Sequence, residues 1–305
     1  MTEYVTGELG SQDRSGRLLV TSPISQSTFE VYPQTIKVKR PFKGEKPNPP
    51  TRSNTQLQGF SDKSRSRLRF VSTNSGHILR SQFGLTYPGD HWPTDGREFK
   101  RHLNTFLTQI RKHIPFLNYL WVAEFQSRGA PHVHLFLDLA ATDENRRLLA
   151  HYWCKAVNPD YLETDDHYRV HSNPKNFIPW AMRQGSYLCK YLDKAAQKTI
   201  PAGFFNFGRW WGNSRGLVSS PETFTADQLA AEFPQVDEET GEVHEGNAIA
   251  FLVRVVGRYH EKQNRRSWFR KTSRSTSALT GGPIFRQALE YLRNTRGNPQ
   301  EPEPF

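Results

Sequence analysis

The chain has 305 residues, 23% of them charged, with a formal net charge of +11 and a pI near 9.7. That length holds one large domain or two small ones, the basic excess indicates a polyanionic partner, and no apolar run approaches the roughly 20 residues of a bilayer span, which favours nucleic acid over a membrane. Two cysteines, Cys154 and Cys189, exclude a disulfide framework and a cysteine-type zinc site, and the start lacks a basic and apolar leader, so we expect a cytoplasmic protein.

Residues 1 to 70 are poor in apolar residues and rich in Ser, Thr, Pro, Lys and Arg. Such a segment buries too little surface to offset its ordering entropy, so we expect a largely disordered arm. It carries 12 basic and 6 acidic residues. It is therefore either a tethered, non-specific DNA-binding arm or a solvated leader without a function of its own.

A folded domain is predicted over residues 71 to 220. Residues 77 to 87 favour a strand that ends at a Pro-Gly-Asp turn. A capping-box-like start at Asp95 and apolar residues at helical spacing predict an amphipathic helix that ends before Pro115. The apolar residues of that helix are Phe99, Leu103, Phe106 and Ile110.

Two strands joined by a tight turn follow, over residues 117 to 126 and 131 to 137. Alternate side chains of a strand share a face, so His132 and His134 point the same way. An isolated His-x-His pair on an apolar strand is more often chance than function. Two adjacent imidazoles nevertheless indicate a metal site.

The turn decides whether a third ligand joins the histidines. A three-residue loop with Gly129 in the left-handed region would set Glu124 opposite His132, on the histidine face. A two-residue loop would shift the pairing by one and remove Glu124 from that face. We expect Glu124 as the third metal ligand, with Gln126 as the second choice.

The region after the histidines contains a predicted helix over residues 143 to 157. Its buried stripe comprises Leu148, Leu149, Tyr152 and Trp153. Residues 168 to 171 are compatible with a short strand. His171 would lie near the metal only if that strand neighbours the histidine pair, and a surface position is the alternative.

A doubled Tyr-x-x-Lys motif follows about fifty residues after the histidines. On a helix, at about 100° per residue, Tyr187 and Tyr191 lie about 40° apart, and Lys190 and Lys194 fill the adjacent arc. Leucines cluster on another side. We therefore expect a helix that starts near Pro179, buries its leucines and presents two phenols and two ammonium groups together.

An aromatic and basic cluster follows over residues 204 to 215. Trp210 and Trp211, beside Arg209 and Arg215, suit the stacking of unpaired bases, with core packing as the alternative for most of the aromatic residues. Arg128, in the turn before the histidines, is a further candidate for DNA contact.

The charge of the chain reverses near residue 220. Residues 221 to 250 carry eight acidic residues and no Lys or Arg, whereas residues 251 to 305 carry eleven Lys or Arg and four acidic residues. We expect an acidic linker and a small basic C-terminal region, with helices over residues 248 to 259 and 284 to 293.

The His-hydrophobic-His triplet followed by the Tyr/Lys motif resembles the HUH endonuclease superfamily. The doubled tyrosine resembles the rolling-circle replication initiators of single-stranded DNA phages and plasmids. The resemblance covers roughly residues 75 to 215. It implies an α/β (α+β) fold related to the ferredoxin-like fold, with a central antiparallel sheet flanked by helices, the histidines on a middle strand and the tyrosines on a helix facing it.

The resemblance also implies a reaction: site-specific nicking and rejoining of single-stranded DNA through a 5′-phosphotyrosine, with a free 3′-hydroxyl that primes synthesis. A phenol titrates near about 10, so Tyr187 and Tyr191 need a base, a cation or the field of a metal to attack. Lys190 and Lys194 either supply positive charge or anchor the DNA backbone. A divalent ion, Mg or Mn, would polarise the scissile phosphate, and two imidazoles with a carboxylate suit Mn better than Mg.

Single-stranded or nicked-origin DNA is the expected substrate, with a host helicase and polymerase as partners, since the sequence lacks a phosphate-loop motif. Within the superfamily a two-tyrosine transposase stays open, whereas relaxases usually place the tyrosine before the histidines. A non-catalytic nucleic-acid-binding protein would form no covalent adduct with DNA. A metal-dependent hydrolase would leave free 5′-phosphate ends.

Overall fold

The structure is a computed structural model that describes residues 8–12, 18–23, 27–40, 59–75, 78–162, 165–179, 199–233, 235–236, 243–244, 248–263 and 276–295. The chain divides into two compact units. The central unit comprises Pro50–Ser219, and the terminal unit comprises Met1–Pro49 together with Ser220–Phe305. The division after residue 219 lies next to the charge reversal near residue 220.

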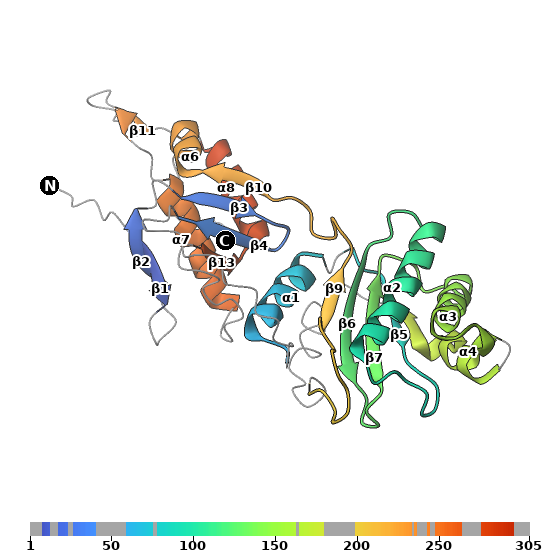
Figure 1. The fold of residues 1–305 in the computed structure, drawn as a ribbon. Coiled ribbons are helices and arrows are strands. Elements are labelled where there is room, and N and C mark those ends of the chain that lie inside the picture. Colours follow the sequence, from blue (N-terminus) through green and yellow to red (C-terminus); the bar gives the residue numbers. More distant parts are fainter. Residues whose placement is uncertain are drawn as a thin grey trace. The chain divides into compact units, whose positions relative to one another are not determined.

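The central unit is built on a five-stranded antiparallel sheet (Figure 1). In spatial order its strands are β8 (Phe177–Pro179), β5 (Ser81–Leu85), β7 (Pro131–Leu137), β6 (Tyr119–Phe125) and β9 (Trp211–Asn213). Helices flank this sheet, which confirms the predicted mixed α and β fold with a central antiparallel sheet. The predicted histidine strand is the middle strand, β7.

Three helices of the central unit, α2 (Gly96–His113), α3 (Asp143–Val157) and α4 (Asp165–Ser172), pack side by side (Figure 1). The side chain of Asp95 caps α2 by accepting a hydrogen bond from the N–H of Arg97. The four predicted apolar residues of α2 are buried, and α2 ends before Pro115, both as predicted. A further helix, α1 (Asp62–Ser75), begins within the segment that was predicted to be disordered.

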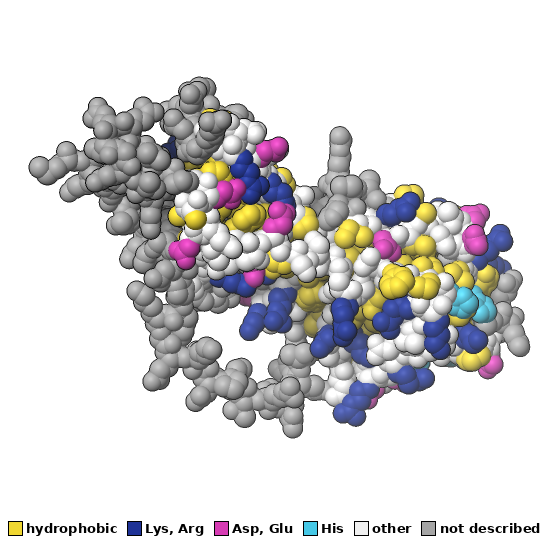
Figure 2. Space-filling view, turned by 90° about the horizontal axis from the view of Figure 1, so that it is seen from above, with side chains coloured by type: hydrophobic (Ala, Val, Ile, Leu, Met, Phe, Trp, Pro, Cys, Tyr) yellow, Lys and Arg dark blue, Asp and Glu magenta, His cyan; other side chains and the backbone are white. Residues whose placement is uncertain are grey.

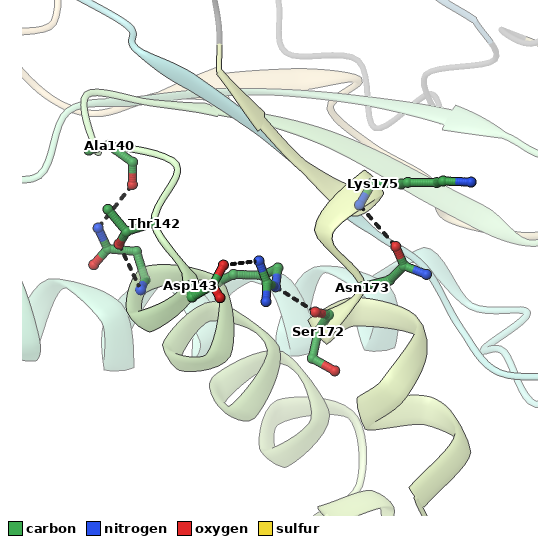
Figure 3. A network of polar contacts seen from close by, with 8 residues as sticks. Ala140, Thr142, Asp143, Ser172, Asn173 and Lys175 are labelled. Atoms are coloured by element: carbon green, nitrogen blue, oxygen red, sulfur yellow. Dashed lines mark hydrogen bonds and ion pairs between the residues drawn. The ribbon is translucent and has the colours of Figure 1, made fainter.

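A polar network ties the start of α3 to the end of α4 (Figure 3). Thr142 caps α3 by accepting from the N–H of Asn145, and the guanidinium of Arg146 bridges Asp143 and the carbonyl of Ser172. The prediction of a strand over residues 168 to 171 is wrong, because these residues are helical in α4. Four residues carry too little periodicity to separate the two states, and the packing of α4 on α3 decides.

The terminal unit has a second antiparallel sheet, in the order β10 (Glu222–Thr225), β3 (Thr28–Val31), β4 (Thr35–Lys39) and β13 (Thr276–Thr280). It also contains α6 (Ala226–Glu232), α7 (Ala248–Gln263) and α8 (Gly282–Asn294), and the predicted C-terminal helices correspond to α7 and α8. Two small sheets pair β1 (Glu8–Gln12) with β2 (Leu18–Pro23) and β11 (Gln235–Val236) with β12 (Val243–His244).

Strands β3 and β4 correct the expectation of a disordered arm for residues 28 to 39. Their apolar residues, Phe29, Val31, Ile36 and Val38, are buried in a core shared with α7 and α8. The partner strands β10 and β13 come from the far end of the chain, so the N-terminal composition alone does not reveal the burial. Within the described part of the chain, the search for membrane-spanning helices finds none that is long and apolar enough.

Candidate metal and DNA-cleavage site

The β6–β7 hairpin brings three potential metal ligands together. The N–H of Gln126 donates to the carbonyl of Ala130 (2.9 Å), and Gly129 adopts a left-handed φ of 87°. This three-residue loop sets Glu124 opposite His132 and Val122 opposite His134. The predicted register is therefore confirmed.

Glu124, His132 and His134 each place one ligand atom within 4.8 Å of the others. Nε2 of His134 lies 2.7 Å from Oε1 of Glu124, and the two imidazole centroids lie 4.7 Å apart. Glu124 and His134 are only 6% and 8% exposed, so a cation at this point would meet ligands that are already shielded from water. Two imidazoles and one carboxylate form a donor set for a divalent transition metal.

Gln82, on β5, provides a test of whether this donor set fits a metal. Its Nε2 lies 3.1 Å from Nδ1 of His134, and its Oε1 is buried without a hydrogen bond among the described residues. Turning the amide by half a rotation exchanges its nitrogen and oxygen, so that Oε1 accepts a proton from Nδ1 of His134. Nε2 of His134 then presents a lone pair toward Glu124, as in metal sites whose histidines donate their other N–H to an oxygen. The residues present therefore fit a divalent ion.

The alternative third ligand, Gln126, has its oxygen committed elsewhere. Oε1 of Gln126 accepts from the hydroxyl of Thr86 (3.2 Å) and from Nε of Arg128 (2.9 Å). The geometry thus favours Glu124 over Gln126. Arg128 also donates to the carbonyls of Tyr87 and Gly89, so its exposed guanidinium fastens the hairpin tip to the loop after β5.

An open pocket of about 470 Å³ lies beside the metal ligands. Its lining comprises Glu124, Gln126, Ser127, Arg128 and His132. The ligand set is thus accessible from the surface, next to an arginine. A phosphate group entering this pocket would meet both His132 and Arg128.

The sequence analysis missed Asn176, which lies over β5 beside His132. A Cβ atom built on Gly84 would come within 2.6 Å of Oδ1 of Asn176 and 3.4 Å of Cε1 of His132. The Nδ2 of Asn176 donates to the carbonyl of Gly84 (2.9 Å). An isolated glycine inside a strand signals such a close approach, and Gly84 was the available signal.

The aromatic cluster divides between the core and the surface. Trp210 is 3% exposed and packs against Phe60, Phe125 and Phe207, so its predicted stacking on unpaired bases is wrong. Trp211 is half-buried, and its indole N–H donates to the hydroxyl of Ser64 (2.9 Å).

Arg209 and Arg215 are exposed, and their contact with DNA stays a prediction. The carbonyl of Arg209 accepts from Nζ of Lys100 (2.6 Å), which lies over the rings of Phe99, Trp121 and Phe207. Burial, followed by the charge of Arg209, lowers the pKa of Lys100 to about 7.

The predicted nucleophiles, Tyr187 and Tyr191, and their lysines, Lys190 and Lys194, lie outside the described residues. The described residues on either side are anchored to the histidine sheet. Pro179 pairs with Ser81 in β8, and Pro201 lies 4.0 Å from the position of a Cβ atom built on Gly129.

Basic side chains gather on one face of the central unit. Figure 2 shows many Lys and Arg side chains over this face of the unit at the right of the view, with few acidic side chains between them. Such a surface attracts a phosphate backbone irrespective of its sequence.

The comparisons with known proteins give one match. A family model of replication-associated proteins, the ORF2 family, matches residues 80–196, a span that includes Glu124, the histidine pair and both candidate tyrosines. Neither the curated proteins nor the solved structures contain a match. The family match supports a replication initiator of the Rep type, for which DNA is the substrate.

Proposed function

We propose that this protein starts rolling-circle replication by nicking and rejoining single-stranded DNA through a phosphotyrosine intermediate. The observation that carries the proposal is the convergence of Glu124, His132 and His134 beside an open pocket. The match of a replication-associated family over the same residues supports it.

Each group has a role in this proposal. Glu124, His132 and His134 hold a divalent ion, and when bound the ion polarises the scissile phosphate. Arg128, on the pocket lining, adds positive charge near the phosphate. Tyr187 or Tyr191 attacks the phosphorus atom, and the departing 3′-oxygen takes up a proton, leaving a 3′-hydroxyl and a 5′-phosphotyrosine.

The phosphotyrosine retains the energy of the broken phosphodiester, so attack by a 3′-hydroxyl reseals the strand without ATP. With two tyrosines, one can hold the first 5′ end while the other cuts at the end of a round. The anchoring of Pro179 and Pro201 to the histidine sheet supports this arrangement, because the chain that carries both tyrosines starts and ends on that sheet.

The test is covalent label transfer in the presence of Mn²⁺. Single-stranded oligonucleotides of mixed sequence carry a label at either the 3′ or the 5′ end, and the products are separated on a denaturing gel. We expect 3′-labelled DNA to label the protein and 5′-labelled DNA not to do so, because the tyrosine retains the 3′ fragment.

Variants assign the chemistry. We expect Tyr187→Phe and Tyr191→Phe each to retain part of the adduct, the double variant to lose it, and Tyr259→Phe on α7 to behave as wild type. If one single variant loses all adduct and the other changes neither cleavage nor rejoining, the protein is a one-tyrosine enzyme. Free 5′-phosphate ends without any adduct would show a hydrolase instead.

A further inference from the structure

A second cluster of metal-binding side chains lies between α3 and α4. Cys154 comes from α3, and His167 and His171 come from α4. One ligand atom from each lies within 4.8 Å of the others, and the three residues are 0%, 3% and 0% exposed. None of the three belongs to the Glu124 donor set.

The spacing of these residues matches a metal site. His167 and His171 are four residues apart on one helix, which puts both imidazoles on the same face. The His-x-x-x-His pattern is a frequent zinc-ligand spacing, and cysteine thiolate with imidazole is a zinc donor set. The bridge from Arg146 to the carbonyl of Ser172 holds α4 against the helix that carries Cys154 (Figure 3).

The hydrogen bonds of the two rings leave one lone pair on each. Nδ1 of His171 lies 3.0 Å from the carbonyl of His167, and Nε2 of His167 lies 3.4 Å from the carbonyl of Thr86, so each ring donates an N–H to a backbone oxygen. Histidines that bind metals are held in this way. Nδ1 of His167 is buried and has no hydrogen bond among the described residues.

One contact competes with a metal. Nε2 of His171 accepts from the N–H of Thr86 (3.1 Å), and an ion at this nitrogen would replace that hydrogen bond. A neutral hydrogen bond contributes less than a bond to a divalent ion in a protein site. Burial lowers the pKa of His171 and His167, which keeps both imidazoles neutral and able to bind a metal.

We propose that Cys154, His167 and His171 bind a zinc ion that fastens α4 to α3. Three protein ligands and a water molecule complete the tetrahedral coordination of zinc. The count of two cysteines excluded a site made of several thiolates, but one thiolate with two imidazoles is a different donor set. The ion would stabilise α4, which has only 8 residues and is too short to be stable alone.

The site would also connect to the catalytic face through Thr86. The backbone of Thr86 contacts His167 and His171, and its hydroxyl donates to Gln126 on the pocket lining. The zinc would therefore set the position of the residue that follows β5, without contact with the substrate. Its loss would act on structure first.

Cobalt substitution of the full-length protein tests the proposal, because only a thiolate ligand gives a charge-transfer band in the near ultraviolet. The Glu124 site has no sulfur, so it does not contribute to this band. We expect the His132→Gln/His134→Gln variant to retain the band, Cys154→Ser to lose it, and Cys189→Ser, the matched cysteine control, to retain it. Absence of the band in wild-type protein, or its loss only in Cys189→Ser, would overturn the proposal.

A measurement on unaltered protein guards against misfolding of the cysteine variant. X-ray absorption of the zinc-loaded wild type should give one sulfur ligand at about 2.3 Å and nitrogen ligands at about 2.0 Å. A zinc spectrum with nitrogen and oxygen ligands alone would exclude this site, and it would leave the proposed nicking activity untouched.

Discussion

Glu124 on β6 faces His132 on β7, and the left-handed backbone of Gly129 in the loop between them fixes that pairing. A side chain other than glycine strains this conformation by about 1–2 kcal/mol, and a β-branched one by more. Relief of the strain would shift the hairpin and move Glu124 away from the histidines.

We therefore expect Gly129→Val to lower the free energy of unfolding by at least about 1 kcal/mol and to weaken Mn²⁺ binding. Gly129→Asn should have a smaller effect on both, because asparagine tolerates the left-handed region. Urea unfolding and calorimetric titration measure the two quantities. Equal losses in both variants would mean that the loop conformation does not control the register.

The carboxylate of Glu124 is expected to contribute directly to metal affinity. Glu124→Gln keeps the shape of the side chain and removes its charge, so Mn²⁺ affinity should fall at least about tenfold. Glu98→Gln, on the exposed face of α2, removes the same charge from a site with no metal ligands and should leave the affinity unchanged. Wild-type affinity in Glu124→Gln would remove Glu124 from the donor set.

Gln82 and Gln126 form a matched pair for a test of the surrounding hydrogen bonds. Gln82→Leu removes the partner of His134 and should weaken Mn²⁺ binding by about 10- to 100-fold. Gln126→Leu removes a side chain bonded to Thr86 and Arg128 and should leave Mn²⁺ affinity nearly unchanged. The reverse order of effects in a calorimetric titration would assign Gln126 as the third ligand.

Lys100 gives the central unit a pH dependence of stability. Its pKa is about 7 in the folded chain and near its usual 10.5 in the unfolded chain, so between these values the unfolded state binds more protons. Stability must then rise with pH, by about 2 kcal/mol from about pH 7 to about pH 9.

Lys100→Met should abolish this rise, whereas Lys112→Met, exposed on the same helix, should retain it. Unfolding by urea, followed by tryptophan fluorescence, measures the stability at each pH. An unchanged pH dependence in Lys100→Met would assign the dependence to other groups.

Arg286 on α8 joins three parts of the terminal unit. Its Nε lies 2.6 Å from Oε1 of Glu222, and its other nitrogens donate to the carbonyls of Val31 and Tyr32. Arg286→Met should destabilise this unit by about 1–2 kcal/mol, because two carbonyls and a carboxylate lose donors. Arg293→Met breaks only the exposed pair with Glu232 and should cost less than about 1 kcal/mol.

Hydrogen exchange distinguishes the units in this test. In Arg286→Met, protection should fall in β3 and α8 and stay unchanged in β6 and β7. A uniform loss of protection over both units would contradict their separate cores.

Local sequence patterns predicted the parts of the fold whose determinants lie close together in the chain. The periodicity of Phe99 and Leu103 suffices for α2, and the loop around Gly129 suffices for the register that brings Glu124 to the histidines. Both depend on neighbours within one helix or one hairpin.

Features that depend on distant partners were not predicted. Val31 and Ile36 are buried by α7 and α8, which lie at the other end of the sequence. The composition around Trp210 is that of a DNA-binding surface, but the indole points into the core beside Phe125. Asn176 reaches His132 only because β8 pairs with β5.

The terminal unit takes strands from both ends of the polypeptide, and this has a consequence for synthesis on the ribosome. β3 and β4 emerge early but cannot complete their sheet until β13 has been translated, whereas all residues of the central unit are available well before that. A premature stop codon before residue 276 would therefore leave the central unit able to fold and would deprive the earliest strands of their partner.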